Sequence, residues 1–405
     1  MPPPPSSTAS ALAASGPGHL AAHTTATTML LNVAHAIDHL VLLIFATAVG
    51  AIASDFGFAR WEDLMPYAAG AFLLFGLGSV PSGRLGDHWG RRAMMLVFAF
   101  GIGATCLLTA VTQNAWQLAA ALTLMGTFAS IYHPVGIPML VQSTTRPGTV
   151  IGINGLVGNL GIAVAAVLTG LTVKYLGWRM AFVIPGVASI LFGFLFARVV
   201  PREGSAPAKR APKQSDLPRR ELARVVLVLT LTSTCGALVF NFTTNGNGEL
   251  MGDRMRAITA DPAVIGALLG LVYVIASFAQ LIVGRAIDRF PLKRLFLLVV
   301  VAQIPLFALA AHAQGWAFYA LAIAFMAFVF GAIPFTDALI VRYVDDRMRS
   351  RVAGVRLAIA FGVSSLAVWL LGPLVKANGF SFLLGLLAAI AALAAAAVTF
   401  LPRAK

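Results

Sequence analysis

The chain has 405 residues, of which 59% are hydrophobic and only 11% are charged. Soluble domains carry about 25% charged residues, so this composition excludes a soluble multidomain protein and indicates a chain that crosses a membrane many times. The net charge of +14 is also typical of nucleic-acid-binding proteins. Membrane proteins, however, concentrate Lys and Arg in their cytoplasmic loops, so the positions of the basic residues decide between the two classes.

Residues 1–27 are rich in Pro, Ser, Ala and Thr and contain neither Lys nor Arg, which predicts a disordered, uncleaved N-terminal tail. Twelve apolar runs follow, each close to the length of about 20 residues that spans a bilayer as a helix. The sequence therefore predicts an all-α polytopic membrane protein with twelve transmembrane helices. The runs cover approximately residues 28–53, 64–83, 92–111, 115–141, 150–175, 179–199, 222–247, 262–284, 294–313, 316–341, 351–376 and 379–401.

A Pro-rich, basic segment, PREGSAPAKRAPKQSDLPRRE, lies between the sixth and seventh runs at residues 201–221. It lacks apolar periodicity, which is typical of a cytoplasmic linker. It divides the chain into an N-terminal six-helix bundle at 28–200 and a C-terminal six-helix bundle at 222–401.

The two halves repeat a short motif. GRLGDHWGRR at 83–92 follows the second run, and GRAIDRFPLKR at 284–294 follows the eighth. Pro134 in the fourth run and Pro334 in the tenth repeat at nearly the same offset. Such a repeat around a central linker indicates an internal duplication.

The basic residues favour one orientation. If both termini are cytoplasmic, 23 of the 29 Lys and Arg residues fall on the inner side and 6 on the outer side. The positive-inside rule then predicts a multi-pass protein of the bacterial inner membrane with both termini in the cytoplasm. Because the charge is spread over many short loops, it forms no basic domain, and binding to nucleic acid is not expected.

The motif at 83–92 resembles the loop motif between the second and third helices of the major facilitator superfamily. The second copy is degenerate. The matching residues are Gly83, Asp87, Gly90, Arg91 and Arg92, and in the second copy Gly284 and Asp288 with the following basic residues. GTFASIYHPVG at 126–136 is similar to a fourth-helix segment of fosmidomycin-resistance-like efflux proteins within that superfamily. The Gly-Pro that ends the antiporter motif of the fifth helix is absent, although Gly152, Gly155, Gly158 and Gly161 form a face of small residues.

This resemblance implies two six-helix bundles around a central cavity, which is lined mainly by helices one, four, seven and ten. The bundles rock between inward-open and outward-open states. The resemblance also implies that the chain acts as a monomer in the lipid bilayer, without a cofactor.

The loop motif predicts a conformational gate. Asp87 is expected to cap a helix or to pair with a basic residue of the neighbouring bundle when the inner gate is closed. The alternative is that the motif only anchors topology through Arg91 and Arg92. The predicted gate consists of Gly83, Asp87, Gly90, Arg91, Arg92 and Asp288.

Two acidic residues fall inside the predicted helices, Asp38 in the first and Asp337 in the tenth. Ionisable residues inside a membrane are functional candidates, because a carboxyl group removed from water is able to exchange a proton near neutral pH. His35 and His39 share a helix face with Asn32, next to Asp38, and His133 precedes Pro134, which is expected to kink the fourth helix.

Three interpretations of these residues remain open. In the first, a proton-coupling and substrate site consists of His35, Asp38, His39, His133 and Asp337. In the second, His35, Asp38 and His39 bind a transition-metal ion. In the third, the same side chains form hydrogen bonds between helices.

Other polar residues are predicted to line the substrate cavity. FNFTTNGNGE at 240–249 is polar and interrupted by glycine, which suggests either an unwound helix end that binds substrate or the start of an extracellular loop. The predicted cavity residues are Asn32, Tyr132, Asn241, Thr244, Asn245 and Arg356.

The function that these features favour is secondary active transport, coupled to protons, which exports a small organic solute by alternating access. Few basic residues fall near the predicted cavity, so a cationic, zwitterionic or neutral solute is expected. The alternatives are transport of a transition metal or metal chelate, and a membrane sensor or scaffold that transports nothing. An enzyme is not expected, since the sequence contains neither a GxxxxGK[ST] loop nor a Gly-x-Ser-x-Gly elbow.

Overall fold

The computed structural model describes residues 17–141, 147–201, 219–343 and 346–402. Most of the predicted linker lies outside these ranges. Within them, some side chains near the linker are not described, and these include the predicted site residues Asp337 and Arg356.

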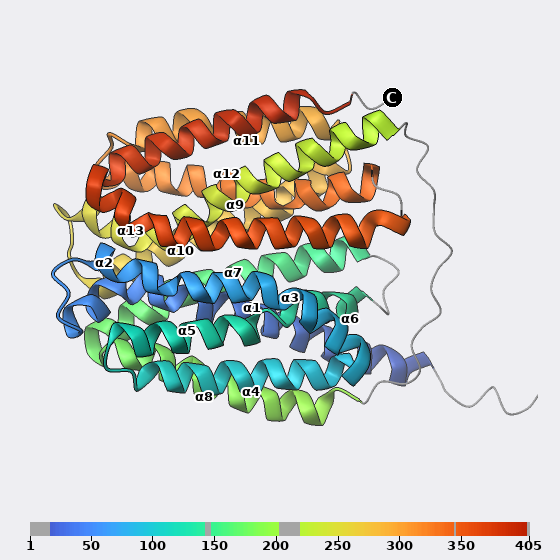
Figure 1. Cartoon of the computed structure of the whole chain (residues 1–405), viewed down its shortest axis with the longest axis horizontal. Helices are drawn as coiled ribbons and strands as arrows, with labels where there is room; N and C mark the ends of the chain where they lie inside the picture. The colour runs from blue at the N-terminus through green and yellow to red at the C-terminus, as the bar shows by residue number, and fades with distance from the viewer. Residues whose placement is uncertain (1–16, 142–146, 202–218, 344–345, 403–405) are drawn as a thin grey trace, which may run out of the picture.

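Figure 1 shows long helices that run side by side, with α1–α8 in the lower half of the view and α9–α13 in the upper half. The first half contains α1 (Pro17–Asp55), α2 (Trp61–Leu64), η1 (Met65–Ala68), α3 (Ala69–Trp89), α4 (Arg91–Ala110), α5 (Ala115–Ala129), η2 (Tyr132–Gly136), α6 (Ile137–Val141), α7 (Pro147–Tyr175) and α8 (Trp178–Val199). The second half contains α9 (Arg219–Met255), α10 (Pro262–Ile287), α11 (Leu292–Ala310), α12 (Gly315–Tyr343) and α13 (Asp346–Thr399).

Eleven helices of the described chain are long and apolar enough to cross a membrane. The predicted eleventh and twelfth helices both fall within α13, which breaks at Gly379 with φ 76° and ψ 173°. That backbone conformation lies outside the helical region and suits a residue without a side chain. Counted on either side of this break, the described chain has twelve long apolar segments, which agrees with the predicted number.

Two helix boundaries differ most from the prediction. α1 begins at Pro17 rather than near residue 28, because the stretch after Pro17 contains several alanines, which favour helix, and proline is well tolerated in a first turn. α9 continues to Met255, through the glycine-containing segment 240–249 that was expected to unwind or to start a loop. The packing of α9 against α12 and α13 outweighs the low helix propensity of its glycines.

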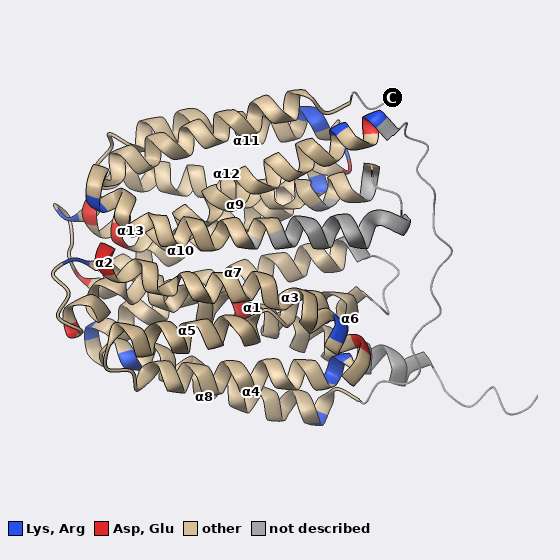
Figure 2. Ribbon diagram, viewed as in Figure 1, with Lys and Arg blue, Asp and Glu red and all other residues tan. Residues whose placement is uncertain are grey.

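The helices have two chemically distinct ends. We call the end where α8 ends and α9 begins the linker end (right in Figure 1) and the opposite end, with the 55–61 and 255–262 connections, the far end. Figure 2 shows that Lys, Arg, Asp and Glu gather at these two ends and leave a long band between them almost free of charge. This distribution is the one expected of helices whose middle lies in hydrocarbon.

The two halves pack against each other mainly through α7 with α10, α3 with α13, and α1 with α9. A Cβ atom added to Gly170 of α7 would lie 3.0 Å from the Cα atom of Gly266 of α10, so the two backbones touch because both residues are glycine. One buried apolar core runs through both halves. A second core, which includes Val225, Phe335 and Val398, belongs to the second half alone and lies toward the linker end.

Candidate functional site

A cavity of about 320 Å³ lies between the two halves. Its wall includes residues of α1, α3, η2 and α7 from the first half and of α9–α13 from the second. In α11, α12 and α13 the wall residues fall in the linker-side parts of the helices, such as Phe296, Ile333 and Ala391. The cavity therefore extends from the middle of the molecule toward the linker end.

Three histidines form one wall of the cavity. His35 and His39 are one turn apart on α1, and His133 comes from η2. The segment η2 is a single π-helical turn around Pro134, which confirms the predicted irregularity of the fourth helix. Because a π turn contains an extra residue, it reorients the side chains next to it, and such turns are frequent at functional sites.

The three imidazole rings contact one another. The ring centroid of His35 lies 4.7 Å from that of His39 and 5.1 Å from that of His133, both edge to face. The rings of His39 and His133 are 6.0 Å apart. One nitrogen from each ring can be chosen so that all three lie within 4.8 Å of one another.

His35 is held in one orientation by the residues behind it. Its ring stacks on Tyr132 with 4.6 Å between centroids, and its Nδ1 lies 2.8 Å from the backbone carbonyl oxygen of Asn154. A carbonyl oxygen only accepts hydrogen bonds, so Nδ1 carries the proton and donates it. In the neutral ring Nε2 then has a free lone pair. This atom is buried and has no hydrogen-bond partner among the described residues.

Asp38 lies directly behind the histidines and is fully buried. Its Oδ2 atom is 3.6 Å from Nε2 of His133, and neither carboxylate oxygen accepts a hydrogen bond from the described part of the chain. Charged side chains are costly in the middle of a membrane protein unless they are paired or functional. The carboxylate therefore faces a cavity-lining imidazole without belonging to the cavity wall.

A polar network supports the cluster from α7. The side-chain amide of Asn154 donates to the Tyr132 hydroxyl at 2.7 Å and to Oδ1 of Asn32 at 2.8 Å. The Tyr132 hydroxyl donates to the backbone carbonyl of Leu31 at 2.9 Å. These bonds join α1, η2 and α7, so they fix the position of His35.

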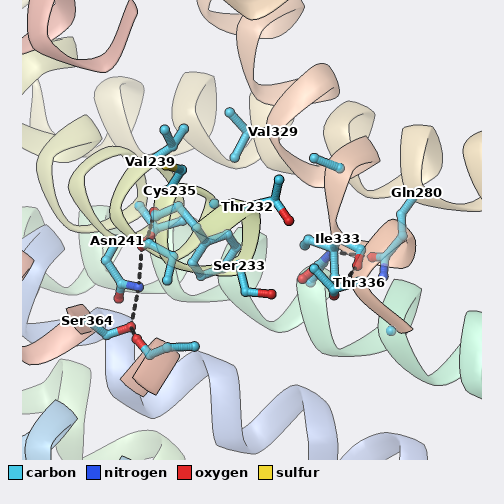
Figure 3. Close-up of a pocket in the computed structure, with 18 of the residues that line it drawn as sticks. Thr232, Ser233, Cys235, Val239, Asn241, Gln280, Val329, Ile333, Thr336 and Ser364 are labelled. Atoms are coloured by element: carbon cyan, nitrogen blue, oxygen red, sulfur yellow. Dashed lines mark hydrogen bonds between the residues drawn. The ribbon is translucent and has the colours of Figure 1, made fainter. Parts of the chain in front are cut away.

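The opposite wall combines apolar side chains with uncharged amides and hydroxyls. Figure 3 shows Asn241 of α9 directed at Ser364 of α13, and the Asn241 amide donates to the Ser364 hydroxyl at 2.7 Å. Asn159 of α7 donates to Gln280 of α10 at 2.6 Å across the two halves. Most other wall residues are apolar, and among those the structure describes there is no Lys, Arg, Asp or Glu.

The structure brings some of the predicted residues to the cavity and places others elsewhere. On the wall are His35, His39, His133, Asn241 and Thr244. Tyr132 was expected in the cavity but is completely buried behind His35, and Asn32 lies in the supporting network. Asn245 is also buried off the wall, where its amide donates to the Asn241 carbonyl. Asp337 and Arg356 lie outside the described side chains.

Sequence reasoning missed several residues. The supporting Asn154 and the wall residues Asn159 and Gln280 are polar residues that interrupt apolar stretches, and that interruption was the available signal. Glu249 was placed beyond the predicted seventh helix, in a loop or at a helix end, but α9 contains it, and a Cβ atom on Gly50 would lie 2.9 Å from its Oε1 atom. The prediction that only two acids lie within helices is therefore wrong.

The predicted gate residues lie at the linker end of the structure. Gly90 has φ 89°, which requires glycine between α3 and α4, and Arg92 donates two hydrogen bonds to the carbonyls of Ala197 and Val200 at the end of α8. A Cβ atom on Gly83 would lie 3.4 Å from Pro134, beside the π turn. Asp87 and Asp288 are exposed, and Arg91 is partly exposed. Their role as a gate stays a prediction.

The far end is closed by ion pairs that join the two halves. Lys174 at the end of α7 pairs with Asp261, which caps α10, and Asp63 of α2 pairs with Lys376 of α13. Between these pairs the backbones approach closely, since a Cβ atom on Gly372 would lie 2.1 Å from the carbonyl oxygen of Glu62. These contacts hold the two halves together at the far end, opposite the direction in which the cavity extends.

The Lys174–Asp261 pair predicts how pH acts on this closure. The hydrogen bond from the Lys174 ammonium lowers the pKa of Asp261, and the N–H groups of Ala263 and Val264 act in the same direction. A carboxylate with a lowered pKa stabilises the closed end at all pH values above its ordinary pKa of about 3.9 and loses that effect only as the pH falls further. We expect the distribution of distances between spin labels at Tyr175→Cys and Ala260→Cys to stay constant from pH 8 to pH 5 and to become broader below about pH 4.

The matched control is Asp261→Asn, which removes the charge at every pH. Its distribution of label distances is expected to be broader than that of the parent above pH 4 and to change less on acidification. If the distance distribution of the parent broadens between pH 7 and pH 5, a group other than Asp261 controls the contact at the far end.

Comparison with known proteins identifies the family. The model of the Major Facilitator Superfamily matches residues 31–251, which is more than half of the chain. The chain belongs to this superfamily. It is a family of membrane transporters, which confirms the predicted fold and the prediction of a transporter rather than an enzyme.

Solved structures show the same superfamily fold. The xylose transporter XylE from E. coli, in an inward-open conformation, superimposes with a TM-score of 0.75 at 14% identity over 94% of this chain and 97% of that one. An inward-facing bacterial homologue of the human lysosomal transporter Spinster gives a TM-score of 0.68 at 15% identity, over 94% of this chain and 95% of that one. At these identities the likeness concerns the fold alone.

Several relatives are named for resistance or export. The multidrug resistance protein MdtG of Salmonella typhimurium is 25% identical over 69% of this chain and 70% of its own length. The puromycin resistance protein of Streptomyces alboniger is 31% identical over 34% of this chain, and the tetracenomycin C resistance and export protein of Streptomyces glaucescens is 29% identical over 43%. These two matches cover only 26% and 32% of the relatives' own lengths.

The family and the apolar helices together show a multi-pass membrane protein. The finer resemblance to fosmidomycin-resistance-like proteins stays a prediction.

Proposed function

We propose that the protein is a proton-coupled exporter that moves a small organic solute through the cavity by alternating access. The observation that carries the proposal is the placement of Asp38. A fully buried carboxylate faces a cavity-lining histidine at 3.6 Å in a band almost without other charges. A carboxyl–imidazole pair is able to hold a proton in one state of the cycle and release it in the other.

Two further features support alternating access from the cytoplasm. At the far end the two halves are joined by ion pairs and close backbone contacts, whereas the cavity extends toward the linker end. The excess of Lys and Arg predicted for the linker side supports a cytoplasmic location for that end and for both termini. Export is supported by the names of the relatives, which refer to resistance to several drugs and to two antibiotics.

The cavity wall favours an uncharged or cationic solute with a large apolar surface. Its described residues carry no Lys or Arg that would neutralise an anion, and its few polar groups are amides, hydroxyls and imidazoles. Sites of this kind bind organic ligands through apolar contact, with a small number of polar groups that set the orientation.

The test is transport by the purified chain in proteoliposomes whose interior is one pH unit more acidic than the medium. An exporter that exchanges one proton for one solute accumulates an uncharged solute up to about tenfold, because one pH unit corresponds to about 1.4 kcal/mol. Puromycin and tetracenomycin C are suitable probes, and protein-free liposomes correct for passive uptake. The absence of protein-dependent, protonophore-sensitive accumulation of both compounds contradicts the proposal.

A further inference from the structure

We propose that the three histidines of the cavity wall bind a divalent transition-metal ion, so that the solutes carried through this cavity include such an ion, alone or complexed with an organic ligand. The inference rests on the proposed function only in treating the cavity as a transport path. The ligands would be His35, His39 and His133, one nitrogen from each ring.

The arrangement of nitrogens suits such an ion. In a tetrahedral site with metal–nitrogen bonds of about 2.0–2.1 Å, the ligand nitrogens lie about 3.4 Å apart. Here they lie within 4.8 Å of one another, and all three belong to side chains that rotate about two bonds. Small rotations of the two partly exposed rings, His39 and His133, close the remaining gap. Imidazole is a preferred ligand of Zn²⁺, Cu²⁺ and Ni²⁺.

His35 is already oriented as a ligand. Its Nδ1 donates to the Asn154 carbonyl, so the lone pair of Nε2 is available, and this buried atom has no other partner among the described residues. A buried nitrogen without a partner costs free energy, which coordination would recover. Metal-binding histidines usually donate their second nitrogen to a backbone carbonyl or a carboxylate in this way.

Asp38 supplies the second element of such a site. Its Oδ2 atom lies 3.6 Å from Nε2 of His133, where a carboxylate orients the ring and makes it a better donor. Its negative charge also offsets the charge of the ion in a region of low dielectric constant. Asp38 is therefore a positioning residue in this proposal, whereas the sequence alone suggested it as a ligand.

The cavity leaves room for more than the ion. Three protein ligands leave at least one coordination position open, and the rest of the wall lies across a space of about 320 Å³. A water molecule occupies about 30 Å³ of liquid, so this space accommodates an organic ligand bound to the metal. The apolar opposite wall and the Asn241–Ser364 pair would then contact that ligand.

The binding test uses the full-length chain without a polyhistidine tag, titrated with Co²⁺ and followed by visible absorption spectroscopy. We expect one ion per chain, with the absorption bands of a tetrahedral, nitrogen-coordinated Co²⁺ ion. His39→Ala and His133→Ala are each expected to weaken binding by at least about tenfold, and Asp38→Asn by about 10–100-fold. His312→Ala, which changes an exposed histidine at the far end, is the matched control and should bind like the parent.

His133→Gln provides a second variant in case an alanine variant does not fold. Glutamine still reaches toward Asp38 but lacks the imidazole, so the protein should remain monodisperse and lose the Co²⁺ spectrum. The proposal would be overturned if the parent, His39→Ala and His133→Gln bound Co²⁺ with equal affinity. It would also be overturned if the folded parent did not bind Co²⁺.

Flux measurements separate this inference from the proposed function. Proteoliposomes receive Co²⁺ alone or Co²⁺ with free histidine, whose complexes carry no net negative charge, and uptake in either arm that is lost in His39→Ala supports a metal cargo and shows in which form it travels. Uptake in neither arm overturns the cargo role. If Co²⁺ fails to bind while puromycin still accumulates, only the metal inference fails. If Co²⁺ binds and is carried while no organic probe accumulates, only the proposed export fails.

Discussion

Replacing Asp38 with asparagine is expected to abolish accumulation of solute against its gradient while leaving the fold intact. The substitution keeps the size of the side chain and removes the carboxylate that faces His133. A neutral amide costs less to bury than a carboxylate without hydrogen-bond donors, so the melting temperature should be equal or higher. In proteoliposomes with a gradient of one pH unit, we expect accumulation to fall from up to about tenfold to the level of protein-free liposomes.

A second measurement distinguishes lost coupling from lost transport. Exchange of labelled for unlabelled solute at equal concentrations on both sides needs no proton, so Asp38→Asn should still catalyse it. Asp55→Asn is the control on the same helix, since that carboxylate lies at the far end, paired with Arg179, and is distant from the cavity. Proton-driven accumulation that survives in Asp38→Asn would remove this residue from the coupling mechanism.

Hydropathy and charge were sufficient to predict the fold, because both act over whole helices. Each spanning run is long enough to be recognised even when single residues deviate from the pattern. The boundaries were less predictable where local propensity and packing compete. The glycines of segment 240–249 suggested a break, yet α9 packs along its length and remains helical, and this changed the position of Glu249 from a loop to a helix.

The histidine cluster was partly predictable. Helical periodicity places His35 and His39 one turn apart, and the His-Pro pair marked the irregular turn that contains His133. A polar residue in an apolar helix marked Asn154 as unusual but did not indicate that it supports these rings. Asn154 is 119 residues from His35 along the chain, and only the packing of α7 against α1 brings them into contact. The same packing explains why Tyr132 lies behind the cluster and not in the cavity.

Replacing Gly372 with alanine is expected to open the far end. The added Cβ atom would lie 2.1 Å from the carbonyl oxygen of Glu62 and 3.1 Å from the Cβ atom of Met65. The first contact is with backbone, so no side-chain rotation relieves it, and α13 must move away from α2. Overpacking of this kind costs about 1–3 kcal/mol, and only the closed arrangement suffers it, since the two helices belong to different halves.

This free-energy cost destabilises the closed far end relative to the open one. The ratio of open to closed molecules should therefore rise by about 5–150-fold, because 1.4 kcal/mol corresponds to a factor of ten. Spin labels at Tyr175→Cys and Ala260→Cys should report a longer mean distance in Gly372→Ala than in the parent. Gly362→Ala is the matched control on the same side of the Gly379 break, since a Cβ atom there meets nothing within 4 Å. An unchanged distance in Gly372→Ala, in a protein of unchanged melting temperature, would mean that the contact between α2 and α13 yields locally and does not hold the far end closed.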